Sequence, residues 1–366
     1  MPDTSAIDWD AHTTSDGDVV EIRVPESFTA MPRIDKFLTP FFPDASRTKI
    51  QRSIKKGHAK VNGADVKKSY PVEPGDRIVA RVIEKPPMEA VPQDLPLDVV
   101  YEDDDLLVVN KAAGRVVHPA PGHRDGTLVN ALLHHVQGDR MSKETPGKSD
   151  AEVGLSVVNA LPSRPDHPVI RPGIVHRLDK GTTGLLVVAK HDVAHRHLAQ
   201  QFKAHTIDRK YVALVWGTPD PPKGTITGAI GRDPHHRTRM AVVDAEQGKQ
   251  ATTHYAVEAG LGDVSRVAFT LETGRTHQIR VHAAHVGHPL LADDTYGGTH
   301  IRYGQQGGKR RTFFDRLFDT LGRPALHAAH LGFTHPMTEE RLTFDAPLPD
   351  DMQAVWARLR EVLGHA

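Results

Sequence analysis

Four of the fourteen residues in KPPMEAVPQDLPLD, at positions 85–98, are prolines. Proline has no backbone N–H and a fixed φ angle, so this stretch is typical of an extended, semi-rigid linker. We therefore expect the chain of 366 residues to fold as separate bodies on either side of it. The predicted parts are an N-terminal tail (1–30), a small domain (31–84) and a larger domain (99–366).

The two parts before the linker carry opposite charge. Residues 1–30 contain seven Asp or Glu and one Arg, and residues 1–18 are polar and acidic enough to predict partial disorder. Residues 31–84 contain twelve Lys or Arg and six Asp or Glu, although the net charge of the chain is zero. Such a basic module suits a polyanionic partner, but a solvated charged face gives the same pattern.

The basic module is predicted to be a small α+β domain. RIDKFLTPFF (33–42) and SRTKIQRSIKKG (46–57) have the pattern of two short helices, and HAKVNG ends in an Asn-Gly turn signal. The second helix has one apolar face and a basic remainder, which consists of Arg47, Lys49, Arg52, Lys55 and Lys56. The module is therefore expected to be two helices on a small sheet, with a basic outer surface.

The larger domain is predicted to mix strands and helices. Two strands flank the acidic turn in LDVVYEDDDLLVVNKAAG, further strands are predicted in GLLVVAK, YVALVWG and RVAFTLET, and TLVNALLHHV is an amphipathic helix. HQIRVHAAHVG (277–287) opens on a strand pattern and can continue as a helix. Residues 138–168 and 297–311 have the composition of flexible excursions.

The absence of certain residues and motifs argues against several kinds of functional site and cellular location. The chain has no cysteine, which excludes disulfides, thiolate zinc sites and a cysteine nucleophile. His277, His282, His285 and His288 lie close in sequence, but with no HExxH pattern we expect no metal. Neither a complete P-loop nor a GxSxG motif occurs. With no signal peptide and no run of eighteen apolar residues, we expect a cytoplasmic protein without a membrane span.

One stretch of the larger domain places an acid among cations beside an apolar strand. GIVHRLDKGTTGLLVVAK (173–190) puts Asp179 between Arg177 and Lys180, before a turn rich in Gly and Thr. An aspartate that caps a turn is the commonest explanation of such a residue. The functional alternative is a general base or nucleophile that nearby cations keep ionised.

A second stretch, LETGRTHQIRVH (271–282), supplies a cation that suits this carboxylate. On the strand predicted there, Arg280 lies between Ile279 and Val281, so its side chain is expected to face a cleft. A fixed arginine opposite Asp179 would hold the acid ionised and oriented. The two stretches together favour the functional reading of Asp179.

The larger domain also contains four long motifs in order: HRLDKGTTGLLVVAK, RKYVALVWG (209–217), LETGRTHQIRVHAAHVGHPLLADDTYGG (271–298) and ALHAAHLGFTHPMTEERLTFDAPLP (325–349). Together they resemble the RluA-type family of RNA pseudouridine synthases. VVHPAPGHRDGTLVNALLHH (116–135) is similar to the branch that includes RluD, which modifies large-subunit ribosomal RNA. The basic module resembles the small RNA-binding domain named after ribosomal protein S-four. The resemblance covers residues 31–355.

The resemblance implies a fold, a reaction and a site. The fold is α+β, with a mixed, largely antiparallel sheet and a central cleft. The reaction turns uridine into pseudouridine in RNA, with no cofactor and no metal, on a base that is flipped into a closed pocket. Asp179 matches the catalytic aspartate, Tyr211 an active-site tyrosine that stacks on the uracil or assists proton transfer, and Arg280 the arginine that pairs with the aspartate. The expected RNA contacts are His176, Arg177, Arg275 and His277 in the larger domain and the five cations of the second helix, Arg47, Lys49, Arg52, Lys55 and Lys56.

The resemblance leaves the substrate open. Large-subunit (23S) ribosomal RNA is favoured by the front module and by the RluD-like stretch at 116–135. Transfer RNA as the substrate, or a non-catalytic role in ribosome assembly, are the alternatives. We expect a monomer. Gly181 stands where the family often has an acid and Thr183 where it often has Ser, and the stretch between Gln137 and Pro172 is longer than usual, which could change the RNA that is accepted.

Overall fold

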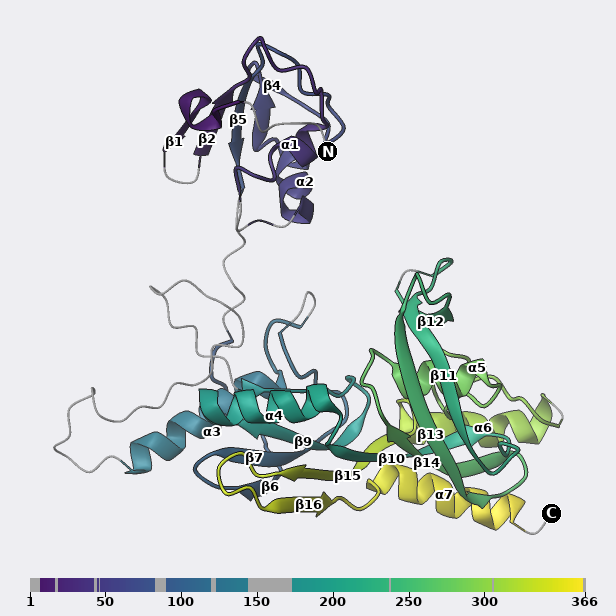
Figure 1. Ribbon diagram of the computed structural model, residues 1–366. Coiled ribbons are helices and arrows are strands. Elements are labelled where there is room, and N and C mark those ends of the chain that lie inside the picture. Colours follow the sequence, from purple (N-terminus) through teal and green to yellow (C-terminus); the bar gives the residue numbers. More distant parts are fainter. Residues whose placement is uncertain are drawn as a thin grey trace. The chain divides into compact units, whose positions relative to one another are not determined.

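The computed structural model forms two compact units, Met1–Glu89 and Ala90–Ala366, each of which is described by itself (Figure 1). The structure describes residues 7–16, 19–42, 45, 47–82, 90–119, 123–143, 173–236, 238–304 and 306–364. Most of the excursion predicted at 138–168 therefore lies outside the described residues, as does the start of the predicted linker.

The first unit is a five-stranded sheet with two helices, which confirms the small α+β domain expected there. Its strands have the spatial order β1-β2-β5-β3-β4. The elements are a 3-10 turn (Trp9–His12), β1 (Thr13–Asp16), β2 (Val19–Arg23), α1 (Ile34–Phe37), α2 (Arg47–Lys55), β3 (Ala59–Val61), β4 (Ala64–Asp65) and β5 (Arg77–Arg81).

The sheet of the first unit begins before residue 31. Val20 and Ile22 of β2 are buried in one cluster with Ile34 of α1 and Ile54 of α2, and β2 pairs with β5 along its length. The aromatic ring of Trp9 also contacts this core. The predicted hairpin after β3 is confirmed, because the Asn-Gly pair has φ angles of 52° and 82°.

The described part of the predicted linker is tethered to the second unit. Asn130 Nδ2 donates a hydrogen bond to the carbonyl of Val91 (2.7 Å), and the backbone N–H of Gly126 donates to Gln93 Oε1 (2.7 Å). The backbone of Gln93 also donates to the carbonyl of Asn130 (3.0 Å). Residues 90–98 thus belong to the second unit, and the boundary found between the units lies at Glu89.

The second unit is built on an 11-stranded sheet in which β9 and β15 form the one parallel pair among the described strands, which confirms the predicted α+β fold with a largely antiparallel sheet. The order of strands is β12-β11-β13-β14-β10-β15-β9-β7-β6, with β16 on β15 and β8 on β9. The strands are β6 (Val99–Glu102), β7 (Leu106–Lys111), β8 (Gly173–Ile174), β9 (Thr183–Ala189), β10 (Asp208–Trp216), β11 (Lys223–Arg232), β12 (Met240–Val243), β13 (Lys249–Gly260), β14 (Val264–Leu271), β15 (Leu326–Thr334) and β16 (Arg341–Asp345).

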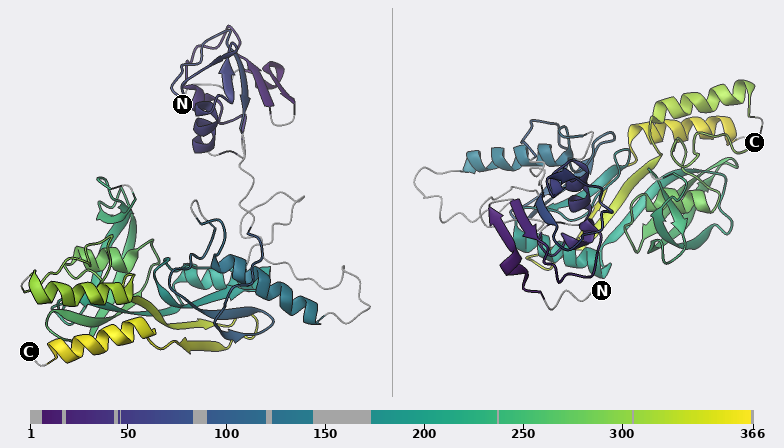
Figure 2. Two further views of the ribbon diagram at one scale, coloured as in Figure 1. Left: turned by 180° about the vertical axis from the view of Figure 1, so that it is seen from behind. Right: turned by 90° about the horizontal axis from the view of Figure 1, so that it is seen from above.

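Among the described residues of this unit, five helices cover the sheet. They are α3 (Leu128–Lys143), α4 (Asp192–Ala204), α5 (Gln278–His285), α6 (Gly308–Leu321) and α7 (Asp350–Leu363). Helices α3 and α5 pack into one apolar cluster, α4 into a second, and α6 with α7 into a third. Figure 2 shows α6 and α7 side by side, and β11–β13 project from the rest of the sheet as an arm.

The centre of the sheet brings the ends of distant segments together. Ala328 of β15 pairs with Tyr211 of β10 on one side and with Gly184 of β9 on the other. Gly184 has a φ of +111°, and a Cβ there would lie 2.2 Å from the carbonyl oxygen of Ala328, so no other residue fits. A register shift between Lys210 and Tyr211 marks a bulge at this point.

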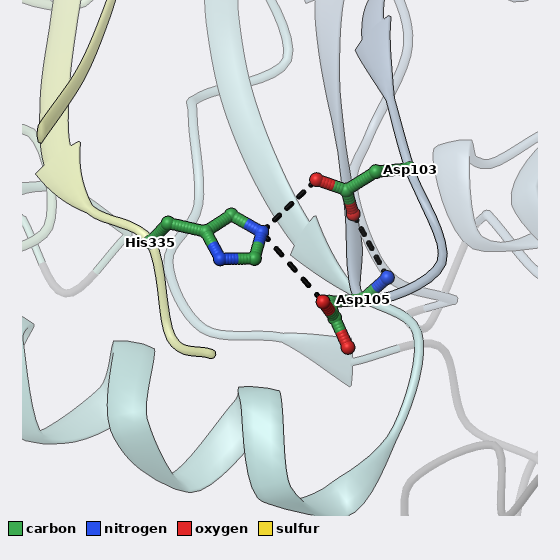
Figure 3. Close-up of side chains that lie close together, drawn as sticks. All are labelled: Asp103, Asp105 and His335. Atoms are coloured by element: carbon green, nitrogen blue, oxygen red, sulfur yellow. Dashed lines mark hydrogen bonds and ion pairs between the residues drawn. The ribbon is translucent and has the colours of Figure 1, made fainter. Parts of the chain in front are cut away.

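The acidic turn between β6 and β7 is confirmed, and it anchors the far end of the sheet. His335 Nε2 lies 3.0 Å from Asp103 Oδ2 and 3.7 Å from Asp105 Oδ2 (Figure 3). His335 Nδ1 accepts backbone N–H groups of the following turn, so the ring proton is on Nε2 and is donated to Asp103. Asp105 also accepts from His191 Nε2 (2.7 Å), at the start of α4. The cluster therefore ties three segments together.

The strand predicted at the start of HQIRVHAAHVG is wrong. Residues Gln278–His285 form helix α5, and Gln278 through Ala283 are all buried. Polar and apolar residues alternate from Gln278 to Ala283, which imitates a strand, but all six are buried in the helix, so this alternation marks no exposed face. The Gln278 amide fixes the start of the helix, because it accepts from the backbone N–H of Arg275 (2.9 Å) and donates to the carbonyl of Thr252 (2.9 Å).

Candidate active site

A pocket of about 770 Å³ opens in the second unit, next to the central strands β9, β15 and β10. Its size is that of a typical ligand site. It brings together all seven residues that the sequence predicted for the site in the larger domain, namely His176, Arg177, Asp179, Tyr211, Arg275, His277 and Arg280. They come from the β8–β9 loop, from β10, and from α5 with the segment that leads into it.

The loop that carries Asp179 is tethered through its backbone. Lys111, at the end of β7, is buried, and its Nζ donates to the carbonyls of Ala112 (2.8 Å), Arg115 (3.0 Å) and Lys180 (3.4 Å). Arg323 Nη1 donates to the carbonyl of Gly181 (3.1 Å), again within this loop. Two basic side chains from distant segments thus fix the peptide groups on the C-terminal side of Asp179.

Gly181 is also confined by the side chains of Arg323 and Pro324. A Cβ at this position would lie 3.1 Å from Cδ of Pro324, which leaves little room for a side chain. Gly181 therefore packs closely against the segment that precedes β15. This is the position at which the resemblance led us to expect an acidic residue.

Lys111 gives the folded protein a distinctive dependence on pH. Burial, aided by the charge of Arg323, lowers the pKa of Lys111 from 10.5 to about 7. Between these two values the unfolded chain binds more protons than the folded chain, so the stability contributed by this site rises with pH. We expect the free energy of unfolding of the wild type to rise relative to that of Lys111→Met, by up to about 4 kcal/mol between pH 7 and pH 10.

Urea unfolding of both proteins at several pH values measures this difference. A difference between the two proteins that stays constant across the range would contradict the shifted pKa of Lys111.

Arg280 links two carboxylates, those of Asp179 and Asp293. The sequence predicted the contact with Asp179. Its Nη1 lies 3.3 Å from Asp179 Oδ2, and its Nε and Nη2 donate to Asp293 at 2.7 and 2.9 Å. Burial alone would lower the pKa of Arg280, but the hydrogen bonds and charge of Asp293, with the charge of Asp179, outweigh burial and raise it. Arg280 is therefore a permanent cation, and its stronger partner is Asp293, which is fully buried.

His277 is the second group beside Asp179. Its Nε2 lies 3.8 Å from Asp179 Oδ2, and its Nδ1 lies 2.9 Å from the hydroxyl of Tyr296. The backbone of His277 has a φ of 59°, which turns the chain sharply before α5 and directs the ring back toward the loop. Burial lowers the pKa of His277, although the charge of Asp179 opposes this shift. The neutral form of the ring is therefore favoured.

Tyr211 lines the same pocket from β10 and is 7% exposed. Burial raises its pKa, the guanidinium of Arg209 opposes that rise, and the carboxylate of Asp179 adds to it. The phenol is therefore protonated at neutral pH. A buried, neutral phenol whose ring lines a pocket can stack on a flat ligand and can donate a proton.

The other predicted RNA contacts in the pocket differ in their exposure and in their partners within the protein. His176 Nε2 accepts a hydrogen bond from the backbone N–H of Val187 (3.0 Å), and its ring stacks on Phe202. Burial, helped by Arg209, lowers the pKa of His176 to about 3, so the ring is neutral and fixes the loop to β9. Arg177 is exposed at the pocket and forms no ion pair with any described residue.

Arg275 is exposed as well, and its Nε donates to the carbonyl of Gln250 on β13 (3.1 Å). It reaches the pocket from the loop before α5. The RNA contacts predicted for His176, Arg177, Arg275 and His277 remain predictions.

In the first unit, all five predicted cations are exposed, four of them on α2 and Lys56 just after it. Arg47 also has a partner within the unit, since its Nη2 lies 2.8 Å from the buried carboxylate of Asp35. Burial would raise the pKa of Asp35, but hydrogen bonds from Arg33, Arg47 and Gln51 lower it overall. Arg47 therefore helps to hold the two helices together. Lys49, Arg52, Lys55 and Lys56 form the rest of the basic surface.

Sequence reasoning missed four residues that do not line the pocket but contact the loop or side chains that form it. They are Lys111, Arg323, Asp293 and Tyr296. Asp293 and Tyr296 lie in the quoted stretch LADDTYGG, but no pattern in it marks one carboxylate as the partner of Arg280. Of the four histidines between positions 277 and 288, two have partners outside the group. His282 Nδ1 contacts Thr253, and His288 Nδ1 contacts the carbonyl of Trp216.

Comparison with known proteins defines the class. The model of the RNA pseudouridylate synthase family matches residues 105–285, and that of the S4 domain matches residues 32–78. RNA pseudouridine synthase 2, chloroplastic, of Oryza sativa subsp. japonica is 44% identical over 342 residues, which is 87% of this chain and 77% of the relative. The chain therefore belongs to the RNA pseudouridine synthases, enzymes that isomerise uridine in RNA. Within this family it has an RluA-type catalytic domain preceded by an RNA-binding S4 domain.

Two further comparisons refine this placement. Ribosomal large subunit pseudouridine synthase D of Zymomonas mobilis is 40% identical over 331 residues, which is 89% of this chain and 93% of that protein. The structure of human RNA Pseudouridylate Synthase Domain Containing 4 matches 72% of this chain and 93% of that chain, with a TM-score of 0.50 and 22% identity, and shares the fold. In the part of the chain that the structure describes, no helix has the length and apolar character needed to cross a bilayer.

Proposed function

We propose that this enzyme isomerises uridine in large-subunit (23S) ribosomal RNA, with Asp179 as the catalytic carboxylate. The observation that carries the catalytic part is the pocket itself. It holds one carboxylate, Asp179, between a permanent cation and an imidazole, and a buried phenol lines the same space. Pseudouridine formation needs a single acid of this kind in a pocket that retains the detached uracil.

The roles proposed for these residues are compatible with the geometry of the pocket. The N1–C1′ bond of uridine breaks, the base turns, and a C1′–C5 bond forms, while the proton on C5 is lost and N1 gains one. Asp179 starts this sequence, by taking the C2′ proton or by attacking the sugar or the base. Arg280 orients Asp179 through one N–H group, and Tyr211 stacks on the flipped uracil. The positions of all three in one pocket support the assignment.

The RNA class is supported by a relative and by the first unit. The Zymomonas mobilis protein, which matches along nearly its whole length, is named for the large ribosomal subunit. The exposed cations of α2 suit the phosphates of a structured RNA, with binding that weakens as salt rises. We propose that the S4 domain contributes capture and orientation of the RNA, whereas the chemistry belongs to the second unit.

Pseudouridine mapping tests the substrate. Ribosomal and transfer RNA are sequenced from cells that lack the protein and from the same cells complemented with the wild-type gene. We expect one or a few large-subunit sites to lose pseudouridine completely and to recover it on complementation. If only transfer RNA sites respond, the enzyme is retained and the ribosomal substrate is wrong. If no RNA changes, the catalytic proposal loses its support.

A further inference from the structure

Tyr296 touches both side chains that lie beside Asp179. Its hydroxyl is 2.9 Å from His277 Nδ1, and its ring lies under Arg280, with the guanidinium carbon 5.0 Å from the ring centroid. The segment is fixed by Asp293, whose carboxylate accepts the backbone N–H of Tyr296 (3.2 Å) while it holds Arg280. One residue thus supports two partners of the proposed catalytic carboxylate.

One hydrogen bond to the Tyr296 hydroxyl has a defined direction. The backbone N–H of Met240 donates to the Tyr296 oxygen (3.0 Å), so the hydroxyl proton is free to point elsewhere. Its neighbour is His277 Nδ1, which can accept this proton. In a neutral imidazole the other nitrogen then carries the hydrogen. The nitrogen that carries it, Nε2, is the one that faces Asp179 at 3.8 Å.

This arrangement gives Asp179 a neutral N–H donor rather than a second cation. His277 is faced by the carboxylates of Asp179 and Asp293 and by the guanidinium groups of Arg280 and Arg177. A protonated His277 would draw Asp179 into a full ion pair and make the carboxylate a weaker base. The separation of 3.8 Å is slightly longer than a hydrogen bond, as is common for catalytic groups before the substrate binds.

We propose that Tyr296 is a positioning residue: its hydroxyl holds His277 in the neutral tautomer whose Nε2–H is directed at Asp179, and its ring supports Arg280. This inference rests on the proposed catalytic role of Asp179. Tyr296→Phe isolates the hydroxyl, because it keeps the ring under Arg280. Tyr255→Phe is a matched control, since the Tyr255 hydroxyl donates to the carbonyl of Pro221 (3.2 Å), a bond that involves no residue of this pocket.

The tautomer can be read directly, without an activity assay. In the full-length protein labelled with ¹⁵N-histidine, the His277 signals are identified by their absence from His277→Gln. We expect a proton on Nε2 alone in the wild type and in Tyr255→Phe, and a mixture of tautomers or a doubly protonated ring in Tyr296→Phe. A His277 proton on Nδ1 in the wild type, or the same tautomer in Tyr296→Phe as in the wild type, overturns the proposal.

Kinetics test the consequence. On a transcript of large-subunit ribosomal RNA, we expect Tyr296→Phe to lower kcat about tenfold with little change in KM, and Tyr255→Phe to match the wild type. Gln can place an N–H group where His277 Nε2 lies, whereas Asn is too short. His277→Gln should therefore retain more activity than His277→Asn, and adding Tyr296→Phe to His277→Asn should cost nothing more.

The two proposals fail in different ways. Wild-type kcat in Tyr296→Phe, measured alongside an inactive Asp179→Asn, overturns the role of Tyr296 and leaves Asp179 in place. An active Asp179→Asn overturns the catalytic assignment instead, and the ¹⁵N measurement then still decides whether Tyr296 sets the tautomer of His277.

Discussion

Asp179→Asn is expected to abolish pseudouridine formation, by at least about 10⁴-fold in kcat, while the protein remains folded. The size of the effect is that of removing a residue on which the first chemical step depends. Stability should change little, by about 1 kcal/mol or less, because asparagine has nearly the same shape and its oxygen can still accept a hydrogen bond from Arg280 Nη1. Single-turnover assays on a large-subunit transcript, with thermal unfolding, separate the two effects.

A nearby acid provides the control for this variant. Asp294 is exposed, and its carboxylate accepts a local hydrogen bond from the hydroxyl of Thr295 (3.1 Å). Asp294→Asn removes one negative charge from the same region and should leave kcat within about twofold of the wild type. If Asp179→Asn kept as much activity as Asp294→Asn, the carboxylate in the pocket would be dispensable and the catalytic proposal would be wrong.

The sequence predicted the contact between Asp179 and Arg280 but gave the wrong local structure for the arginine. The prediction assumed a strand in which Arg280 alternates with Ile279 and Val281. In the structure the segment is a helix in which these three residues are all buried. Arg280 nevertheless reaches the pocket, because the α5 segment lies against the strands that carry Tyr211 and its neighbours. Local periodicity misleads where six successive residues of a helix are all buried, whereas complementary charge identified Asp179 as the partner of Arg280.

Other features of the site depend on contacts that a local pattern does not contain. Lys111 and Lys180 are far apart in sequence, and they meet only because β7 and β9 are adjacent strands. Asp293 follows Arg280 closely in the chain, yet it shares its acidic dipeptide with Asp294, which is exposed. Only the folded chain shows which of the two carboxylates is buried. By contrast, the front hairpin and the acidic turn depend on short-range signals, and both were predicted correctly.

Arg280→Met is expected to reduce both stability and activity, for reasons that a second substitution can separate. Arg280 donates twice to Asp293, which is fully buried, and once to Asp179. Without the guanidinium, Asp293 becomes a buried charge with no counter-charge, which costs about 3–5 kcal/mol of unfolding free energy. Asp179 loses its orienting partner at the same time, which should lower kcat about a hundredfold or more.

The double variant Arg280→Met with Asp293→Asn distinguishes these two roles of the arginine. Asparagine at position 293 can still accept the backbone N–H groups of Thr295 and Tyr296, and it carries no charge to strand in the interior. The loss of stability should therefore shrink to about 1–3 kcal/mol, the cost of an unpaired polar group, while kcat stays as low as in Arg280→Met. Urea unfolding and single-turnover kinetics on the same preparations measure both quantities. Activity that recovered together with stability would mean that Arg280 acts only by holding Asp293, and that its contact with Asp179 does not contribute to the reaction.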